Sequence, residues 1–478
     1  MERRTFIGAL TGAGLHGSAA PARRPNIITI LLDDQRWDAF SAYGKPGILS
    51  LLKTPHMDRL AREGVHFRNA FCTTSLCSPS RASIMSGKYV HTHGVSGLEG
   101  TLPPGCAIFP QALQAAGYET GFVGKWHFGK QSDTPQPGFD FWAGFRGQGA
   151  YFNPVMNVNG TRTPTTGYVT DILTGYALDF VSRKRDKPFF LHLAHKAPHD
   201  PCTPPKHLES LYKDSEVPLP NTYYEKHDDK PAWFLEFHDH DSFHVKFHPP
   251  DRYQTYVKNY CRSLVSVDEN LGRLLTLLDE RGLTENTAIL WLSDNGHFMA
   301  EHQLFSKMMP YEESMRIPLL VRWPGHAPAG LQRDEIALNV DIAPTVLEMA
   351  GVKPSADMEG RSFLRLAQGR RVPDWRQSFR FEYFAEGGWG LPSLEAVRSS
   401  DGWMYARYPD WEQLYWMAED PYQIRNLAAN PKYASRKNAL SAELRKLGGG
   451  QDLHPPYREG PHAYKRMSEP VHTPHPPD

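Results

Sequence analysis

The chain of 478 residues is poor in cysteine, carries no excess of charge of either sign and contains no long apolar run. Its five cysteines form no Cys-x-x-Cys pair, which argues against a zinc ribbon or dithiol redox site, and their odd number leaves at least one unpaired. Lys+Arg and Asp+Glu both total 53, so the basic excess typical of nucleic-acid-binding proteins is absent. No membrane-spanning helix is expected, because no segment is apolar over the roughly 20 residues that a bilayer requires. The cysteines are Cys72, Cys77, Cys106, Cys202 and Cys261.

Residues 1–22 have the pattern of an export signal. Twin arginines, Arg3 and Arg4, precede a weakly apolar stretch at 6–15, and small residues follow at 18–20 and 22. The pattern resembles a twin-arginine signal, and its apolar part is too short to span a bilayer. We therefore expect the twin-arginine export machinery to deliver the protein to the periplasm or the exterior. A disordered cytoplasmic tail is the alternative interpretation.

Short apolar runs bounded by turn residues predict buried parallel strands, at 26–32, 120–123, 189–194, 288–292 and 319–322. Helical patterns lie between them, at 55–63 and 253–281, and Gly64 and Gly282 follow as stop signals. Strands that alternate with helices predict an α/β fold with a large, mostly parallel central sheet flanked by helices.

The chain divides into a main domain at 23–370, a smaller C-terminal α+β subdomain at 371–450 and a Pro/His-rich tail at 451–478. The subdomain is predicted from short strands at 379–384 and 403–407 and from a helix at 433–447. Within the main domain, 217–250 is polar and punctuated by prolines, so we expect a long excursion over the surface. Its histidines and aspartates could contact substrate or a second metal, although a solvated insertion is the simpler interpretation: His238, Asp239, His240, Asp241, His244 and His248.

Polar residues follow the first four predicted strands, at 33–34, 124–127, 195–199 and 293–296. Because ligands bind beyond the carboxyl ends of strands in open α/β sheets, these clusters should converge on one site. Four of the residues are hard oxygen donors of the kind that Ca²⁺ or Mg²⁺ prefers: Asp33, Asp34, Asp294 and Asn295. The alternative for each pair alone is a helix cap with a solvated neighbour.

The segment 77–87 predicts a short helix with a cysteine at its start. Ser78 is a good N-cap, Pro79 suits the first helical position, and Gly87 is a stop signal. Cys77 then lies just before a helix N-terminus, where backbone N–H groups and the helix dipole favour an anion. The alternative is a buried cysteine before an ordinary helix.

This segment, Cys-x-Pro-Ser-Arg followed by Ala-Ser-Ile-Met-Ser-Gly, resembles the signature of the type I sulfatases in the alkaline-phosphatase-like superfamily. The motifs at 33–34, 124–127, 197–199 and 293–296 match those of the family in the same order, as do Lys307 and the segment 311–318. The resemblance covers about residues 25–450 and implies an alkaline-phosphatase-like fold.

The resemblance implies that a formylglycine-generating enzyme oxidises Cys77 to formylglycine. The hydrated aldehyde, a gem-diol, would attack the sulfur and displace the alcohol, and its second hydroxyl would then help to expel sulfate. The implied metal is Ca²⁺, with Mg²⁺ as an alternative. Its matching ligands are Asp33, Asp34, Cys77, Asp294 and Asn295.

The remaining motif residues acquire roles from the same resemblance. Arg81 would hold the gem-diol, and Lys125 and Lys307 would hold sulfate oxygens where negative charge develops. His127 would take the diol proton, and His199 would donate a proton to the departing alcohol. The alternative, without the resemblance, is that the two lysines are solvated and the two histidines have a structural role.

Segments 311–316 and 340–345 look most like those of sulfatases that act on sulfated carbohydrates, such as N-acetylglucosamine-6-sulfatases. The chain departs from the family at 297–303, where Ala300 and Gln303 replace two glycines, and this puts the wall of the substrate pocket in doubt. Two other functions stay open: a phosphate or phosphonate monoester hydrolase of the same superfamily, and a non-catalytic protein that binds sulfated glycans.

Overall fold

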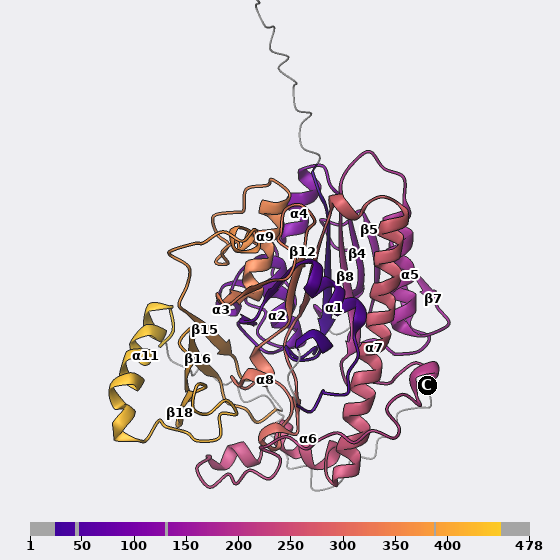
Figure 1. Ribbon diagram of the computed structural model, residues 1–478. Coiled ribbons are helices and arrows are strands. Elements are labelled where there is room, and N and C mark those ends of the chain that lie inside the picture. Colours follow the sequence, from indigo (N-terminus) through magenta and orange to yellow (C-terminus); the bar gives the residue numbers. More distant parts are fainter. Residues whose placement is uncertain (1–23, 44–46, 130–131, 387–388, 451–478) are drawn as a thin grey trace, which may run out of the picture.

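The computed structural model describes residues 24–43, 47–129, 132–386 and 389–450 (Figure 1). The predicted export signal and the Pro/His-rich tail lie outside the described residues. In the part of the chain that is described, no helix combines the length and apolar character that crossing a membrane would need.

A ten-stranded sheet forms the centre of the molecule, in the order β13-β2-β12-β9-β1-β8-β4-β5-β6-β7. Its middle strands β9, β1, β8, β4 and β5 run parallel; the first four were predicted, and β5 was not. The strand predicted at 319–322 exists but runs antiparallel to β9, so its expected parallel direction was wrong. The strands are β1 (Asn26–Asp33), β2 (Val65–Phe67), β4 (Glu119–Lys125), β5 (Phe141–Phe145), β6 (Val155–Val158), β7 (Thr161–Pro164), β8 (Phe189–Pro198), β9 (Thr287–Ser293), β12 (Leu319–Arg322) and β13 (Leu331–Arg333).

Both faces of this sheet are covered, which explains why its central strands are apolar without interruption. Side chains of β1 alternate between two hydrophobic cores: Ile27 and Leu31 belong to one, and Ile28 and Ile30 to the other. Helices α5 (Val169–Ser182) and α7 (Pro250–Glu280) pack on one face, where Figure 1 shows them side by side. The other face carries α2 (Cys77–Ser86), α4 (Phe109–Ala115) and α9 (Ile342–Met349).

The C-terminal part is a separate four-stranded antiparallel sheet with one helix against it. The sheet contains β15 (Ser378–Tyr383), β16 (Leu394–Ser399), β17 (Trp403–Arg407) and β18 (Glu412–Trp416). Helix α11 (Ala434–Lys446) buries Leu440 and Leu444 against it, close to the predicted bounds. An ion pair of 2.9 Å between Arg398 and Glu312 joins the subdomain to the main domain.

The excursion at 217–250 is only partly the surface segment that the sequence predicted. It contains η3 (Ala232–Leu235) and α6 (His238–Lys246), and four of its phenylalanines are buried: Phe234, Phe237, Phe243 and Phe247. These rings anchor an otherwise polar segment, whose histidines and prolines are typical of a surface loop.

The smaller helices of the described residues are η1 (Ser41–Tyr43), α1 (Pro55–Glu63), α3 (Val90–His93), η2 (Lys206–Leu208), η4 (Thr284–Asn286), η5 (Glu301–Gln303), α8 (Glu312–Met315), η6 (Asn339–Asp341), α10 (Leu364–Ala367) and η7 (Pro431–Tyr433). The smaller strands are β3 (Ala70–Phe71), β10 (Phe298–Met299), β11 (Phe305–Ser306) and β14 (Ala337–Leu338).

Candidate active site

The carboxyl ends of the central strands meet at one place, as the sequence predicted. Asp33, the last residue of β1, pairs with Pro198 of β8, and its neighbour Leu32 pairs with Ser293 of β9. The backbone N–H of Asp34 donates to Asp294 Oδ1 at 3.1 Å. Residues separated by more than 250 positions in the chain therefore form one polar centre inside the fold.

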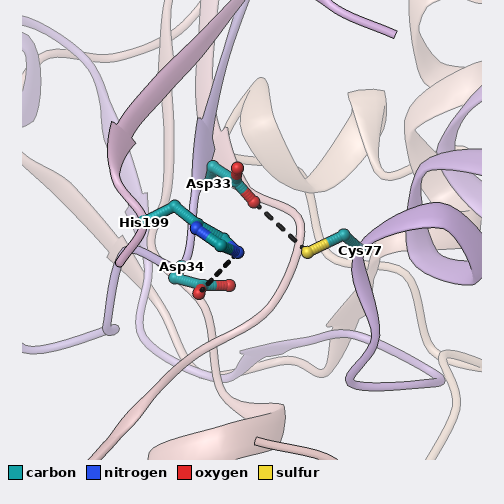
Figure 2. A group of neighbouring side chains, drawn as sticks. All are labelled: Asp33, Asp34, Cys77 and His199. Atoms are coloured by element: carbon teal, nitrogen blue, oxygen red, sulfur yellow. Dashed lines mark hydrogen bonds and ion pairs between the residues drawn. The ribbon is translucent and has the colours of Figure 1, made fainter. Parts of the chain in front are cut away.

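Cys77 is the first residue of α2 and points into this centre (Figure 2). Its Sγ lies 3.4 Å from Asp33 Oδ1 and 2.9 Å from Lys307 Nζ. The prediction that Ser78 caps the helix was wrong, because the helix starts two residues earlier than expected, at Cys77, with Leu76 as its N-cap. The Ser78 hydroxyl instead donates to the carbonyl of His127 at 2.6 Å, which ties the cysteine segment to the end of β4.

A mixed group of oxygen, sulfur and nitrogen donors, largely buried, fits a cation. Potential ligand atoms of Asp33, Asp34, Cys77 and His199 lie within 4.8 Å of one another, which no other such group of the described residues matches (Figure 2). Asn295 Nδ2 donates to Asp34 Oδ1 at 2.7 Å, whereas the buried Asn295 Oδ1 has no hydrogen-bond partner among the described residues. A buried acceptor without a donor, next to several carboxylates, is the arrangement that Ca²⁺ or Mg²⁺ would complete.

The carboxylates differ in their electrostatic surroundings. Burial alone would raise the pKa of Asp33, but Lys125 and Arg81 outweigh it and hold that pKa well below its usual range. Burial raises the pKa of Asp34, against the opposing effect of Lys307. Asp33 therefore carries a firm negative charge at neutral pH.

Three cations surround these carboxylates. The Lys125 ammonium pairs with Asp33, and the Lys307 ammonium pairs with Asp34. Burial opposes the charge of Lys307, but Asp34 outweighs it and holds the lysine pKa well above its usual value. Arg81 Nε donates to Asp294 Oδ2 at 2.8 Å, and its Nη1 donates to the carbonyl of Lys125 at 2.7 Å. The site thus holds several positive charges near Cys77, of which Lys307 contacts its sulfur.

Both motif histidines lie in the site and are neutral in these surroundings. Burial, reinforced by Lys125, lowers the pKa of His127 well below its usual value. Burial likewise lowers the pKa of His199. His199 Nδ1 lies 2.8 Å from the carbonyl of Asp200, so this nitrogen carries the proton, while Nε2 lies 3.8 Å from Asp34 Oδ2.

The thiol of Cys77 is not activated by its position. Burial and the charge of Asp33 raise the pKa of Cys77 to about 12, although Lys125 and Lys307 act in the opposite direction. A thiol with such a pKa is protonated at neutral pH, and a protonated thiol is a poor nucleophile. All five cysteines of the chain are free, so no disulfide competes for Cys77.

Sequence reasoning missed Gln148, whose Oε1 accepts a hydrogen bond from Lys125 Nζ at 2.5 Å. Gln148 lies in a loop after β5, outside any strand end or motif, so no pattern pointed to it. His297, one of the departures at 297–303, also borders the site. Its Nδ1 lies 3.6 Å from Asp34 Oδ2, and its ring stacks on Tyr256 and Tyr260.

As far as the structure describes the chain, the histidines of the 217–250 excursion do not form a second metal site. Among the described residues, the group around Cys77 is the one in which three or more potential ligand atoms lie close together. The expectation of a solvated loop was also wrong in part, because Asp239 and His240 are buried in α6. Asp239 Oδ2 accepts the backbone N–H of Lys307 at 3.2 Å, so the excursion contacts the rim of the site.

Comparison with known proteins gives a consistent result. Residues 25–352 match the family Sulfatase, and residues 300–449 match the family N-sulphoglucosamine sulphohydrolase, C-terminal. The N-acetylglucosamine-6-O-sulfatase of Bacteroides thetaiotaomicron is 32% identical over 505 residues, covering 91% of this chain and 89% of that protein.

Solved structures share the same architecture. A protein in complex with its substrate D-glucosamine-2-N,6-O-disulfate aligns with a TM-score of 0.79 at 28% identity, covering 89% of this chain and 97% of that chain. The phosphonate monoester hydrolase of Agrobacterium radiobacter aligns with a TM-score of 0.75 at 23% identity, covering 89% and 95% of the two chains. The second likeness shows a shared fold alone.

Proposed function

The chain belongs to the sulfatase family, type I, of the alkaline-phosphatase-like superfamily, and from this premise we propose that it removes sulfate from sulfated carbohydrates with a formylglycine made from Cys77. The proposed substrates are N-acetylglucosamine-6-sulfate or glycosaminoglycan fragments that carry this sulfate. Support comes from the 32% identical relative that bears the name N-acetylglucosamine-6-O-sulfatase.

The observation that carries the proposal is the placement of Cys77 Sγ. This atom lies at the start of α2, 2.9 Å from the Lys307 ammonium and 3.4 Å from Asp33 Oδ1. A helix N-terminus and nearby cations favour an anionic group such as sulfate. Since the unmodified thiol is protonated, its position has a catalytic use only after chemical conversion. Formylglycine supplies there a nucleophilic oxygen that the thiol lacks.

The chain's own residues would divide the remaining work. Asp33, Asp34, Asp294 and Asn295, with residue 77, would hold a Ca²⁺ or Mg²⁺ ion. The bound ion would supply positive charge that lowers the pKa of the nucleophile. Lys125 and Lys307 would exchange part of their contact with carboxylates for sulfate oxygens once the ion neutralises Asp33 and Asp34. Arg81 would keep Asp294 in place, through the hydrogen bond of 2.8 Å.

The two histidines would transfer protons. His199 Nε2 faces the centre while Nδ1 donates to the carbonyl of Asp200. Because neutral His199 holds its proton on Nδ1, Nε2 would first take up a proton, which the negative charge of bound sulfate favours, and would then pass it to the departing alcohol. His127 would accept the proton that residue 77 releases when sulfate leaves. Its segment is fixed to the cysteine segment by the Ser78 hydroxyl.

A matched pair of substrates tests this function against the phosphate-ester alternative. Purified enzyme, supplied with Ca²⁺, is assayed on N-acetylglucosamine-6-sulfate and on N-acetylglucosamine-6-phosphate, which differ only in the transferred group. We expect kcat/KM to be at least about a hundredfold higher for the sulfate. Faster hydrolysis of the phosphate, or of a phosphonate monoester, would assign the chain to the alternative activity.

Maturation and export are part of the same proposal. A formylglycine-generating enzyme would modify Cys77, and the twin-arginine machinery would export the protein to the periplasm or beyond. Replacing Arg3 and Arg4 with lysine should retain the protein in the cytoplasm, as measured by fractionation. Equal export of this variant and the wild type would contradict export by the twin-arginine machinery.

A further inference from the structure

Lys196 is a buried cation that the mechanism above does not use. It lies near the end of β8 and is 3% exposed. Among the described residues, its ammonium forms no ion pair or hydrogen bond, and Nζ lies over the ring of Tyr151, 4.8 Å from the centroid. The site lysines Lys125 and Lys307, in contrast, each contact a carboxylate.

The two neighbouring carboxylates favour the charged form of Lys196 but form their ion pairs with other cations. Asp33 pairs with Lys125. Asp200 pairs with Lys246 at 2.8 Å. Lys196 is therefore a surplus positive charge in a buried environment, and burial together with Lys125 lowers its pKa to about 8. Burying an unpaired ammonium is unfavourable, and contact with an aromatic face offsets only a part of that cost.

The position of Lys196 connects it to the reaction centre. The carbonyl of Lys196 accepts the backbone N–H of His199 at 3.1 Å, so both residues belong to one turn. The hydroxyl of Tyr151, whose ring covers the ammonium, donates to the carbonyl of His199 at 2.6 Å. Lys196 is thus held beside His199, the residue proposed to protonate the departing alcohol, which is the side where the sugar must lie.

We propose that Lys196 binds a second anionic group of the substrate, a sulfate or carboxylate other than the one that is cleaved. The proposal rests on the proposed function and adds to it a preference for sugars that carry two negative charges. An anion on the sugar would provide the counter-ion that the protein does not supply. A charge-assisted hydrogen bond of this kind contributes on the order of 1.5–3 kcal/mol, equivalent to roughly ten- to a hundredfold in affinity.

The test compares Lys196→Met, which keeps the length of the side chain and removes its charge, with the wild type on three substrates. The first is N-acetylglucosamine-6-sulfate, with one charged group. The second is N-sulfoglucosamine-6-sulfate, and the third is a 6-sulfated N-acetylglucosamine linked to a uronic acid. The ratio of kcat/KM for a doubly charged substrate to that for the singly charged one should fall at least about tenfold in the variant, through KM. Comparison of the second and third substrates shows whether Lys196 prefers a second sulfate or a carboxylate.

Two further variants serve as controls. Lys196→Arg keeps the charge and should restore most of the ratio. Lys187→Met removes an exposed lysine beyond the opposite end of β8 and should leave the ratio as in the wild type. An unchanged ratio in Lys196→Met would overturn the proposal. An equal loss on all three substrates would also overturn it, since Lys196 would then act on the cleaved group or on His199.

A binding measurement keeps this result separate from the fate of the proposed function. Titration of Cys77→Ala with N-sulfoglucosamine-6-sulfate should show at least about tenfold tighter binding than the same protein with Lys196→Met added. If the wild type cleaves none of the three sugars but this difference is found, the proposed activity fails and the anion site stands. Equal affinity of the two proteins overturns the anion site alone.

Discussion

The carbonyl oxygen of Ala194 lies 1.8 Å from the point where a Cβ on Gly124 would stand. Gly124 has a φ of 117°, a left-handed conformation that side chains strongly disfavour. This close approach lets β4 pair with β8 up to the residue before Lys125, and so places the lysine beside Asp33. Steric exclusion of a side chain therefore explains why the Gly-Lys-Trp-His motif begins with glycine.

We expect Gly124→Ala to lower the free energy of unfolding by more than about 3 kcal/mol, because backbone must shift to relieve the clash. Gly160→Ala is the matched control, since Gly160 has a φ of 94° but open space around its Cβ position. Gly160→Ala should lower the free energy of unfolding by only about 1–2 kcal/mol, the cost of placing a side chain at a positive φ. Urea unfolding measures both, and equal losses would show that the contact with Ala194 is unimportant.

Removal of the metal should affect both stability and turnover. Because a ligand of the native state stabilises it by mass action, Ca²⁺ at a hundredfold excess over its Kd should add about 2.7 kcal/mol to the free energy of unfolding. Chelation should abolish sulfate release and lower Tm. Asn295→Ala removes the unpartnered Oδ1 and should weaken the Ca²⁺-dependent shift in Tm, whereas Asp186→Ala, an exposed carboxylate elsewhere, should preserve it. Full activity after thorough chelation would contradict the metal site.

Asp268 in α7 should make stability depend on pH. Its carboxylate accepts the backbone N–H of Met57 at 2.7 Å, and burial raises its pKa from 3.8 to about 7. Because the folded state holds this proton more tightly than the unfolded state, the contribution of Asp268 to stability decreases as pH rises from about 4 to 7. Asp268→Asn keeps an acceptor oxygen without the charge.

The Asp268→Asn variant should therefore gain stability relative to the wild type between pH 5 and pH 8, by on the order of 2 kcal/mol. Urea unfolding at the two pH values measures this difference. A difference between variant and wild type that does not change with pH would show that the carboxyl titrates normally in the folded protein.

Mass spectrometry of the peptide that contains Cys77 tests the maturation step. Protein produced with a formylglycine-generating enzyme should yield this peptide with an aldehyde in place of the thiol-bearing carbon. Arg81→Lys, which changes the Cys-x-Pro-x-Arg motif, should yield mostly the unmodified thiol. An unmodified thiol in fully active wild-type protein would refute the role of formylglycine, and in an inactive glycan-binding protein it would favour the non-catalytic alternative.

The sequence predicted the strand-end residues well because their position follows from a general property of parallel sheets. Asp33 and Asp294 follow apolar runs, and such runs locate strand ends without any tertiary information. The direction of β12 could not be predicted in the same way, since a buried run has the same pattern in either direction.

Gln148 was overlooked, and Lys196, although part of the predicted cluster at 195–199, was given no role of its own. Gln148 lies in a loop, and only the tertiary fold brings it within 2.5 Å of Lys125. Lys196 lies within β8, which continues four residues beyond the apolar run that predicted it. A lysine inside a buried strand is a signal that could have been used, because a buried charge needs a partner.

The central claim is that sulfate esters are cleaved at residue 77, and sulfate release by Cys77→Ala tests it most directly. With N-acetylglucosamine-6-sulfate as substrate, the matured wild type should release sulfate continuously. Cys77→Ala should release none above the uncatalysed rate, while its Tm without metal stays close to that of the wild type and a smaller Ca²⁺-dependent shift in Tm remains, because the other four proposed ligands are unchanged. Sulfate release by Cys77→Ala at the wild-type rate would contradict the account.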